Sequence, residues 1–196
     1  MEKQKLEQLK EIINEFKAKE IIERNEQSPF ITSKVYDIIT NSGLKLKRAK
    51  LQKGGKDGSA AIIIPYVGND VLLLCIEPRV FTELTVGVGF PAGYIEEGED
   101  PKEAALRELR EETGLVPERI EEVDAFYQDE GCSAAFNHIF IAYGCKKVYE
   151  QELDQDEYIR YMNFTTDDVF ELEKLGYINT ANSKLCLSHV RKMKGR

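Results

Sequence analysis

Three glutamates close together in the sequence could hold a metal ion. If their segment is helical, Glu111 and Glu112 lie three and four residues beyond Glu108, about 5–6 Å from it at Cβ. Carboxylates gathered in this way repel one another, and a hard divalent cation such as Mg²⁺, which prefers oxygen ligands, offsets the repulsion. For any single glutamate the alternative is a place on a solvated acidic helix face. The three together favour metal binding.

Local signals predict that these glutamates do lie on a helix. Asp100 is a good N-cap and Pro101 suits the first helical position, while Glu103 stands where a capping box places its carboxylate. Gly114 supplies a left-handed stop at the other end. We therefore expect a helix over residues 101–113.

The segment that contains this helix resembles the Nudix box of the Nudix hydrolases. The matching residues are Gly93, Glu99, Arg107, Glu108, Leu109, Glu111, Glu112, Gly114 and Leu115. The resemblance implies that Glu108, Glu111 and Glu112 bind catalytic Mg²⁺, with Mn²⁺ as an alternative ion, and that the Ala92 carbonyl is a further ligand. It also implies that Arg107 is the ion-pair partner that orients the carboxylates.

Two charged residues outside the box are candidates for contact with substrate and water. Arg79 follows an apolar run, and its guanidinium suits a phosphate or carboxylate, with a surface salt bridge as the alternative. By resemblance to ADP-ribose pyrophosphatases, Arg79 would bind substrate, and Glu157 would orient or deprotonate the attacking water. Glu152 and Asp154 are rivals for the role of base, and a solvated loop is the alternative to any such role.

The nearest resemblance is to the ADP-ribose pyrophosphatase and ADP-sugar diphosphatase subgroup. It implies hydrolysis of a nucleoside diphosphate linked to another group, first of all ADP-ribose or an ADP-sugar, to AMP and a sugar phosphate. Alternatives are hydrolysis of a nucleoside triphosphate or coenzyme A, and a module that senses a nucleotide without cleaving it. The chain departs from the subgroup at Glu130 and Gly131, where a proline is usual.

Around these residues the sequence predicts an α/β protein. Apolar residues at Leu9, Ile13 and Phe16 form one stripe of a helix expected from residue 2 to about 24, which we expect to pack on the core of its own domain. Two strands, at 31–40 and 44–52, are predicted on either side of a turn.

The resemblance adds the fold and the domain organisation. It implies that residues 53–196 form a Nudix hydrolase domain, an α/β/α sandwich with a mixed sheet. The helix expected from the apolar stripe lies outside this resemblance; with the β-hairpin arm it makes up residues 1–52, a region that we expect to serve homodimerisation.

The distribution of charge limits the partners. The net charge is −8, and residues 96–130 alone hold fourteen acidic side chains against four basic ones. Nucleic acid, which demands positive charge, is therefore not an expected partner, whereas a small anion bridged by a cation is. The four cysteines form no metal-binding pair, and no apolar run is long enough for a membrane span, so we expect reduced thiols and a cytoplasmic protein.

Overall fold

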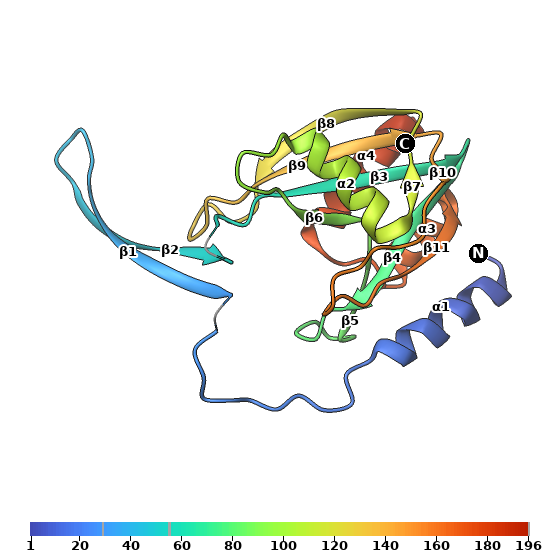
Figure 1. Cartoon of the computed structure of the whole chain (residues 1–196), viewed down its shortest axis with the longest axis horizontal. Coiled ribbons are helices and arrows are strands. Elements are labelled where there is room, and N and C mark those ends of the chain that lie inside the picture. Colours follow the sequence, from blue (N-terminus) through green and yellow to red (C-terminus); the bar gives the residue numbers. More distant parts are fainter. Residues whose placement is uncertain (29, 55, 196) are drawn as a thin grey trace.

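A mixed sheet forms the centre of the molecule (Figure 1). The computed structural model describes residues 1–28, 30–54 and 56–195, and within them this sheet has seven strands. Five run in the order β11-β4-β3-β9-β8, and β5 and β6 extend it by pairing with β4 and β3. The seven strands are β3 (Ala60–Gly68), β4 (Val71–Pro78), β5 (Val86–Gly89), β6 (Ala92–Tyr94), β8 (Arg119–Tyr127), β9 (Phe136–Tyr143) and β11 (Arg160–Thr165). β3 and β9 are parallel and the other pairs antiparallel, which makes the sheet mixed.

Helices cover both faces of this sheet, which confirms the predicted α/β/α sandwich. On one face, α2 (Pro101–Thr113) buries Ala105 and Leu109 against Ile63. On the other face, α3 (Thr166–Lys174) and α4 (Ala181–Met193) pack in the core that contains Ile62 and Ile64. Because both faces are covered, β3 is apolar at consecutive positions instead of alternating with polar residues. Two short strands, β7 (Leu115–Val116) and β10 (Lys146–Lys147), pair beside this body.

The N-terminal helix α1 (Lys3–Phe16) packs on the second of these faces, as expected. Leu9 is fully buried and Ile13 nearly so, in the same core as α3 and α4. The predicted end near residue 24 was wrong, because the apolar stripe stops at Phe16 and the following Ile21 and Ile22 are exposed. Within this segment, the Ala18 amide donates a hydrogen bond of 2.9 Å to Thr85 Oγ1.

The predicted hairpin is present as an arm that projects away from the body (Figure 1). β1 (Ile31–Ile39) and β2 (Lys45–Lys53) pair in antiparallel fashion, and every residue of β1 is exposed. Val35 and Ile39 are 63% and 71% exposed. An isolated two-stranded ribbon is marginally stable in water, so the arm has apolar surface to bury against another surface.

The ends of α2 follow the local signals in the sequence. Asp100 accepts a hydrogen bond of 2.9 Å from the Lys102 amide, and Gly114, with φ of 70°, ends the helix. Glu103, where the sequence suggested a capping box for α2, is exposed. In α3 the capping box is formed, because the side chains of Thr165 and Asp168 each accept a hydrogen bond from the other residue's backbone amide. No helix in the described part of the chain has the length and apolarity to cross a bilayer.

Candidate active site

A cavity of about 600 Å³ lies at the end of the sheet where β4, β5 and β6 meet the loop before β11 and the start of α4. Its lining brings together five of the residues singled out from the sequence: Arg79, Ala92, Gly93, Glu112 and Glu157. Glu108 lies directly behind Gly93, which is itself part of the wall. Residues that are 78 positions apart in the chain therefore share one site.

Glu112 is a buried carboxyl group at the inner wall of this cavity. It is 6% exposed, and its Oε2 accepts a hydrogen bond of 3.2 Å from the Ala92 amide. Burial, followed by the charges of Glu77, Glu108 and Glu157, raises the pKa of Glu112 well above its ordinary value. Carboxyl groups from α2, from β4 and from the loop before β11 thus converge on one point.

Arg107 holds the outer carboxylates of α2. Its Nε and Nη2 bind the two oxygens of Glu99 at 2.9 and 3.0 Å, and Nη1 binds Glu108 at 2.7 Å and Glu111 at 3.1 Å. Nη2 also donates to the Tyr94 carbonyl at 2.9 Å. The hydrogen bond to Glu99, above all, raises the pKa of Arg107, so its charge is permanent. This network ties the loop before α2 to the glutamates on the helix.

The oxygen atoms around Glu112 are of the kind that bind a hard divalent ion. Carboxylate and carbonyl oxygens are the ligands that Mg²⁺ takes, and Glu108, Glu111, Glu112 and Ala92 supply them. The missing side chain of Gly93 makes room, since a Cβ there would lie 1.9 Å from Glu108 Cδ. Within the described residues, no three acidic, His or Cys side chains already surround an ion position. Arg107 forms ion pairs with Glu108 and Glu111, so a cation that binds these carboxylates has to share them with Arg107 or displace it.

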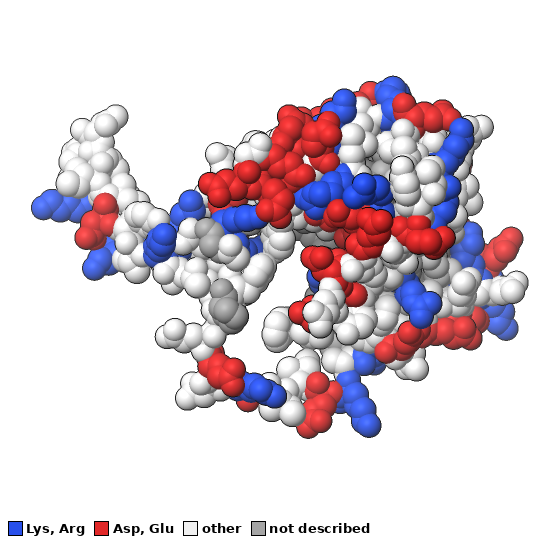
Figure 2. Space-filling model, in the orientation of Figure 1, with Lys and Arg blue, Asp and Glu red and all other residues white. Residues whose placement is uncertain are grey.

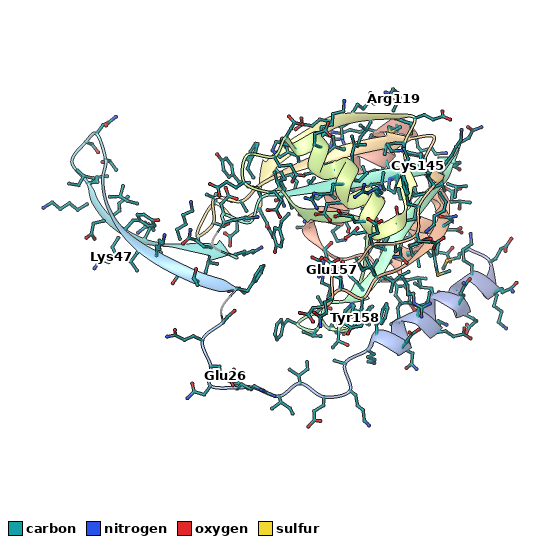
Figure 3. The ribbon with its side chains drawn as sticks, in the orientation of Figure 1. Glu26, Lys47, Arg119, Cys145, Glu157 and Tyr158 are labelled. Atoms are coloured by element: carbon teal, nitrogen blue, oxygen red, sulfur yellow. The ribbon has the colours of Figure 1, made fainter. Side chains whose placement is uncertain are left out.

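Glu157 reaches the cavity from the loop before β11 (Figure 3). Its Oε2 accepts a hydrogen bond of 3.2 Å from the Asp154 amide, and its own amide donates to the Asp154 carbonyl at 3.0 Å. The rival Glu152 instead forms an ion pair of 3.7 Å with Arg110 on α2. Neither Glu152 nor Asp154 is among the described residues that line the cavity, so of the three candidate carboxylates only Glu157 faces a molecule bound there.

Glu77 is a member of the site that reasoning from the sequence missed. It lies near the end of β4, and its Oε1 is 2.7 Å from Arg79 Nη2. Burial raises the pKa of the Glu77 carboxyl; the Arg79 charge lowers it and the Glu157 charge raises it further. The signal for Glu77 was present, since it is an acidic residue directly after an uninterrupted apolar strand interior.

The surface around the site is strongly charged. In Figure 2 acidic side chains gather over the face that α2 presents, with a strip of basic side chains among them. Figure 3 shows Lys47 far out on the arm, away from Glu157. Lys53, the last residue of β2, nevertheless lines the cavity, so the base of the arm brings one basic side chain to this site in addition to Arg79.

Comparison with known proteins places the site in a family context. A family model described as NUDIX domain matches residues 56–183. The ADP-ribose pyrophosphatase of Bacillus subtilis (strain 168) is 28% identical over 158 residues, which cover 80% of this chain and 83% of that protein. The ADP-sugar pyrophosphatase of Mus musculus is 52% identical over 88 residues, 43% of this chain and 40% of that one. A solved structure of an ADP compounds hydrolase has a similar fold, with a TM-score of 0.73 at 24% identity over 88% of this chain and 91% of that chain.

Proposed function

Since this chain belongs to the NUDIX domain family, we propose that it is a Mg²⁺-dependent pyrophosphohydrolase that cleaves ADP-ribose or an ADP-sugar to AMP and a sugar phosphate. The observation that supports this most is that Glu112, Arg79 and Glu157 line the same cavity. The substrate class is drawn from the two similar pyrophosphatases, whose names specify ADP-ribose and ADP-sugar.

Each residue has a part in this proposal that follows from its chemistry. Arg79 binds the diphosphate, because a guanidinium offers several N–H donors to phosphate oxygens. Glu157 accepts the proton of the attacking water as that water forms a bond to phosphorus and the bond to the bridging oxygen breaks. Glu108, Glu111, Glu112 and the Ala92 carbonyl would hold Mg²⁺, or Mn²⁺ in its place. The ion would supply charge neutralisation and a lowered pKa of bound water.

The proposal extends to a homodimer. The arm carries exposed apolar side chains on a ribbon that cannot bury them itself, and we expect a second copy of the chain to cover them. The four cysteines are unpaired, which supports the proposed location in the reducing cytoplasm. Light scattering coupled to gel filtration would measure the mass, and a monomer at all concentrations would contradict the dimer.

The decisive experiment is a substrate panel with and without Mg²⁺. ADP-ribose, an ADP-sugar, dATP and coenzyme A would be incubated with the protein, and the release of AMP, pyrophosphate and phosphate measured. We expect AMP from ADP-ribose or the ADP-sugar, and only when Mg²⁺ is present. Faster turnover of dATP or coenzyme A would reassign the substrate. Nucleotide that binds with Mg²⁺ and is recovered intact would reassign the protein as a sensing module.

A further inference from the structure

The backbone of Arg79 is held at both of its polar groups. Its amide donates to the Thr85 carbonyl at 2.9 Å, and its carbonyl accepts from Thr82 Oγ1 at 2.8 Å. Thr85 itself has a φ of 57°, which is unfavourable for a β-branched residue. The turn from 79 to 85 is therefore closed tightly, although the Arg79 side chain is 53% exposed.

Two neighbours fix the direction of that side chain. Glu77 lies near the end of β4, two positions before Arg79, with Pro78 between them to restrict the backbone, and it forms the 2.7 Å ion pair with Nη2. On the adjacent strand, Gly87 is the partner of Glu77 in the β4–β5 ladder. A Cβ at Gly87 would lie 2.7 Å from Arg79 Cγ, so the aliphatic stem of Arg79 rests directly on this glycine.

We propose that Glu77 is a positioning residue that holds Arg79 in its diphosphate-binding orientation, with Gly87 as the surface on which Arg79 lies. The proposal rests on the proposed function, which supplies the diphosphate. The contact with Glu77 involves Nη2, and a guanidinium has five N–H donors in one plane, so the remaining donors can bind phosphate oxygens. A flexible arginine would lose side-chain entropy on binding substrate, and Glu77 removes part of that cost in advance.

Charge alone predicts the opposite effect from positioning, which makes the idea testable. Glu77 carries negative charge into a cavity meant for an anion, so its neutralisation would tighten nucleotide binding if only repulsion mattered. Loss of positioning would weaken binding instead. A third possibility is that Glu77 serves the metal, in which case its neutralisation would change the affinity for the ion and leave metal-free binding of nucleotide unchanged.

The experiment measures ADP-ribose binding by calorimetry in EDTA, where no turnover occurs. We expect Glu77→Gln and Gly87→Ala each to weaken ADP-ribose binding roughly tenfold. This is the effect of losing one charge-assisted hydrogen bond between Arg79 and a phosphate oxygen. Each has a matched control. Glu83→Gln removes an exposed charge from the same turn, and Gly68→Ala adds a Cβ that makes only an ordinary contact of 3.6 Å. Both controls should bind like the wild type.

Two further measurements separate positioning from other roles. Glu77→Gln in an Arg79→Ala background should weaken binding by less than about twofold, because the group that Glu77 orients is already gone. Mn²⁺ binding, measured by electron paramagnetic resonance, should stay within about twofold of wild type in Glu77→Gln, and KM for ADP-ribose should rise more than kcat falls. Melting temperatures of all variants would identify any that are misfolded.

Several results would overturn the proposal. These are unchanged or tighter ADP-ribose binding by Glu77→Gln, full additivity with Arg79→Ala, or a fall in Mn²⁺ affinity in place of nucleotide affinity. A failure of the proposed function looks different, because the wild type would then neither bind ADP-ribose in EDTA nor hydrolyse it with Mg²⁺.

Discussion

Replacing Glu112 with glutamine should stabilise the metal-free protein and at the same time abolish its response to Mg²⁺. The carboxyl group is buried beside other carboxyl groups, with one backbone donor at 3.2 Å. A glutamine of the same shape can still accept from the Ala92 amide, and its NH₂ group can donate to the neighbouring carboxylates. The substitution therefore removes a buried charge without leaving a cavity.

The size of the stabilisation follows from the charges around Glu112. For an assumed separation of about 8 Å and an effective dielectric constant of about 20, two like charges repel by about 2 kcal/mol. Burial adds to this cost, while the ion pairs that Glu77 and Glu108 form with Arg79 and Arg107 offset part of it. We expect the net gain to be about 1–3 kcal/mol, or about 3–10 °C in melting temperature for a chain of this size.

The stability of the protein in EDTA should also depend on pH. The folded protein raises the pKa of Glu112 above the ordinary value of 4.5, so the folded state holds this proton more tightly than the unfolded chain does. Its stabilising effect is fully present below pH 4.5 and is lost as the pH rises through the raised pKa. Glutamine does not titrate, so the difference in melting temperature between Glu112→Gln and wild type should grow as the pH increases above 4.5.

The assay is thermal unfolding in EDTA and in Mg²⁺, with Glu103→Gln as the control because Glu103 is exposed on the same helix. Wild type and control should gain stability from the ion, by about 2.7 kcal/mol at a free concentration a hundred times Kd. Glu112→Gln should gain nothing and show no Mg²⁺-dependent turnover. The reasoning is refuted if this variant melts no higher than wild type in EDTA or keeps the Mg²⁺ response.

Three further changes test other parts of the site and fold. Gly93→Ala would force the Glu108 carboxylate, 1.9 Å from the new Cβ, to move by about 1 Å or more, whereas metal–ligand distances hold within about 0.2 Å. Mn²⁺ binding should weaken at least about tenfold, and an unchanged affinity would argue against Glu108 as a ligand. Glu157→Gln should lower kcat about 10²–10⁴-fold in an AMP-release assay while Mn²⁺ still binds; a normal kcat would assign the base elsewhere. Leu9→Ala should cost about 2–5 kcal/mol in urea unfolding, and a cost below about 0.5 kcal/mol would contradict the packing of α1.

The parts of the fold that could be predicted from the sequence are those that local chemistry determines. Both ends of α2 were correct, because Asp100 and Gly114 act on backbone groups within a few residues. The prediction of the hairpin was also correct, because the turn between its two strands is determined by residues that are adjacent in the sequence. β5 and β6 were not predicted as strands, since each is short and contains glycine, and their order comes from pairing with β4 and β3.

In the candidate site, too, local spacing predicted some residues, while others depend on tertiary packing. The glutamates of α2 could be identified together because helical spacing brings them together. Glu77 stands two residues before Arg79, which was a signal for that pair, but its approach to Glu112 and Glu157 depends on how β4 lies beside β5 and the loop before β11. The length of α1 was overestimated because charged residues after Phe16 tolerate a helix, while packing against the sheet ends where the apolar stripe ends.

Thr85 has an unfavourable backbone conformation in the turn after Arg79, while its hydroxyl binds the segment that follows α1. A threonine with positive φ costs about 1–3 kcal/mol that glycine would avoid, yet glycine could not accept the hydrogen bond from the Ala18 amide. Trimming the protein to residues 56–183 would leave the unfavourable backbone, remove its compensation and uncover the surface beneath Leu9 and Ile13. The residues that match the family model therefore do not include all of the chain that stabilises the conformation of the turn at residues 79–85.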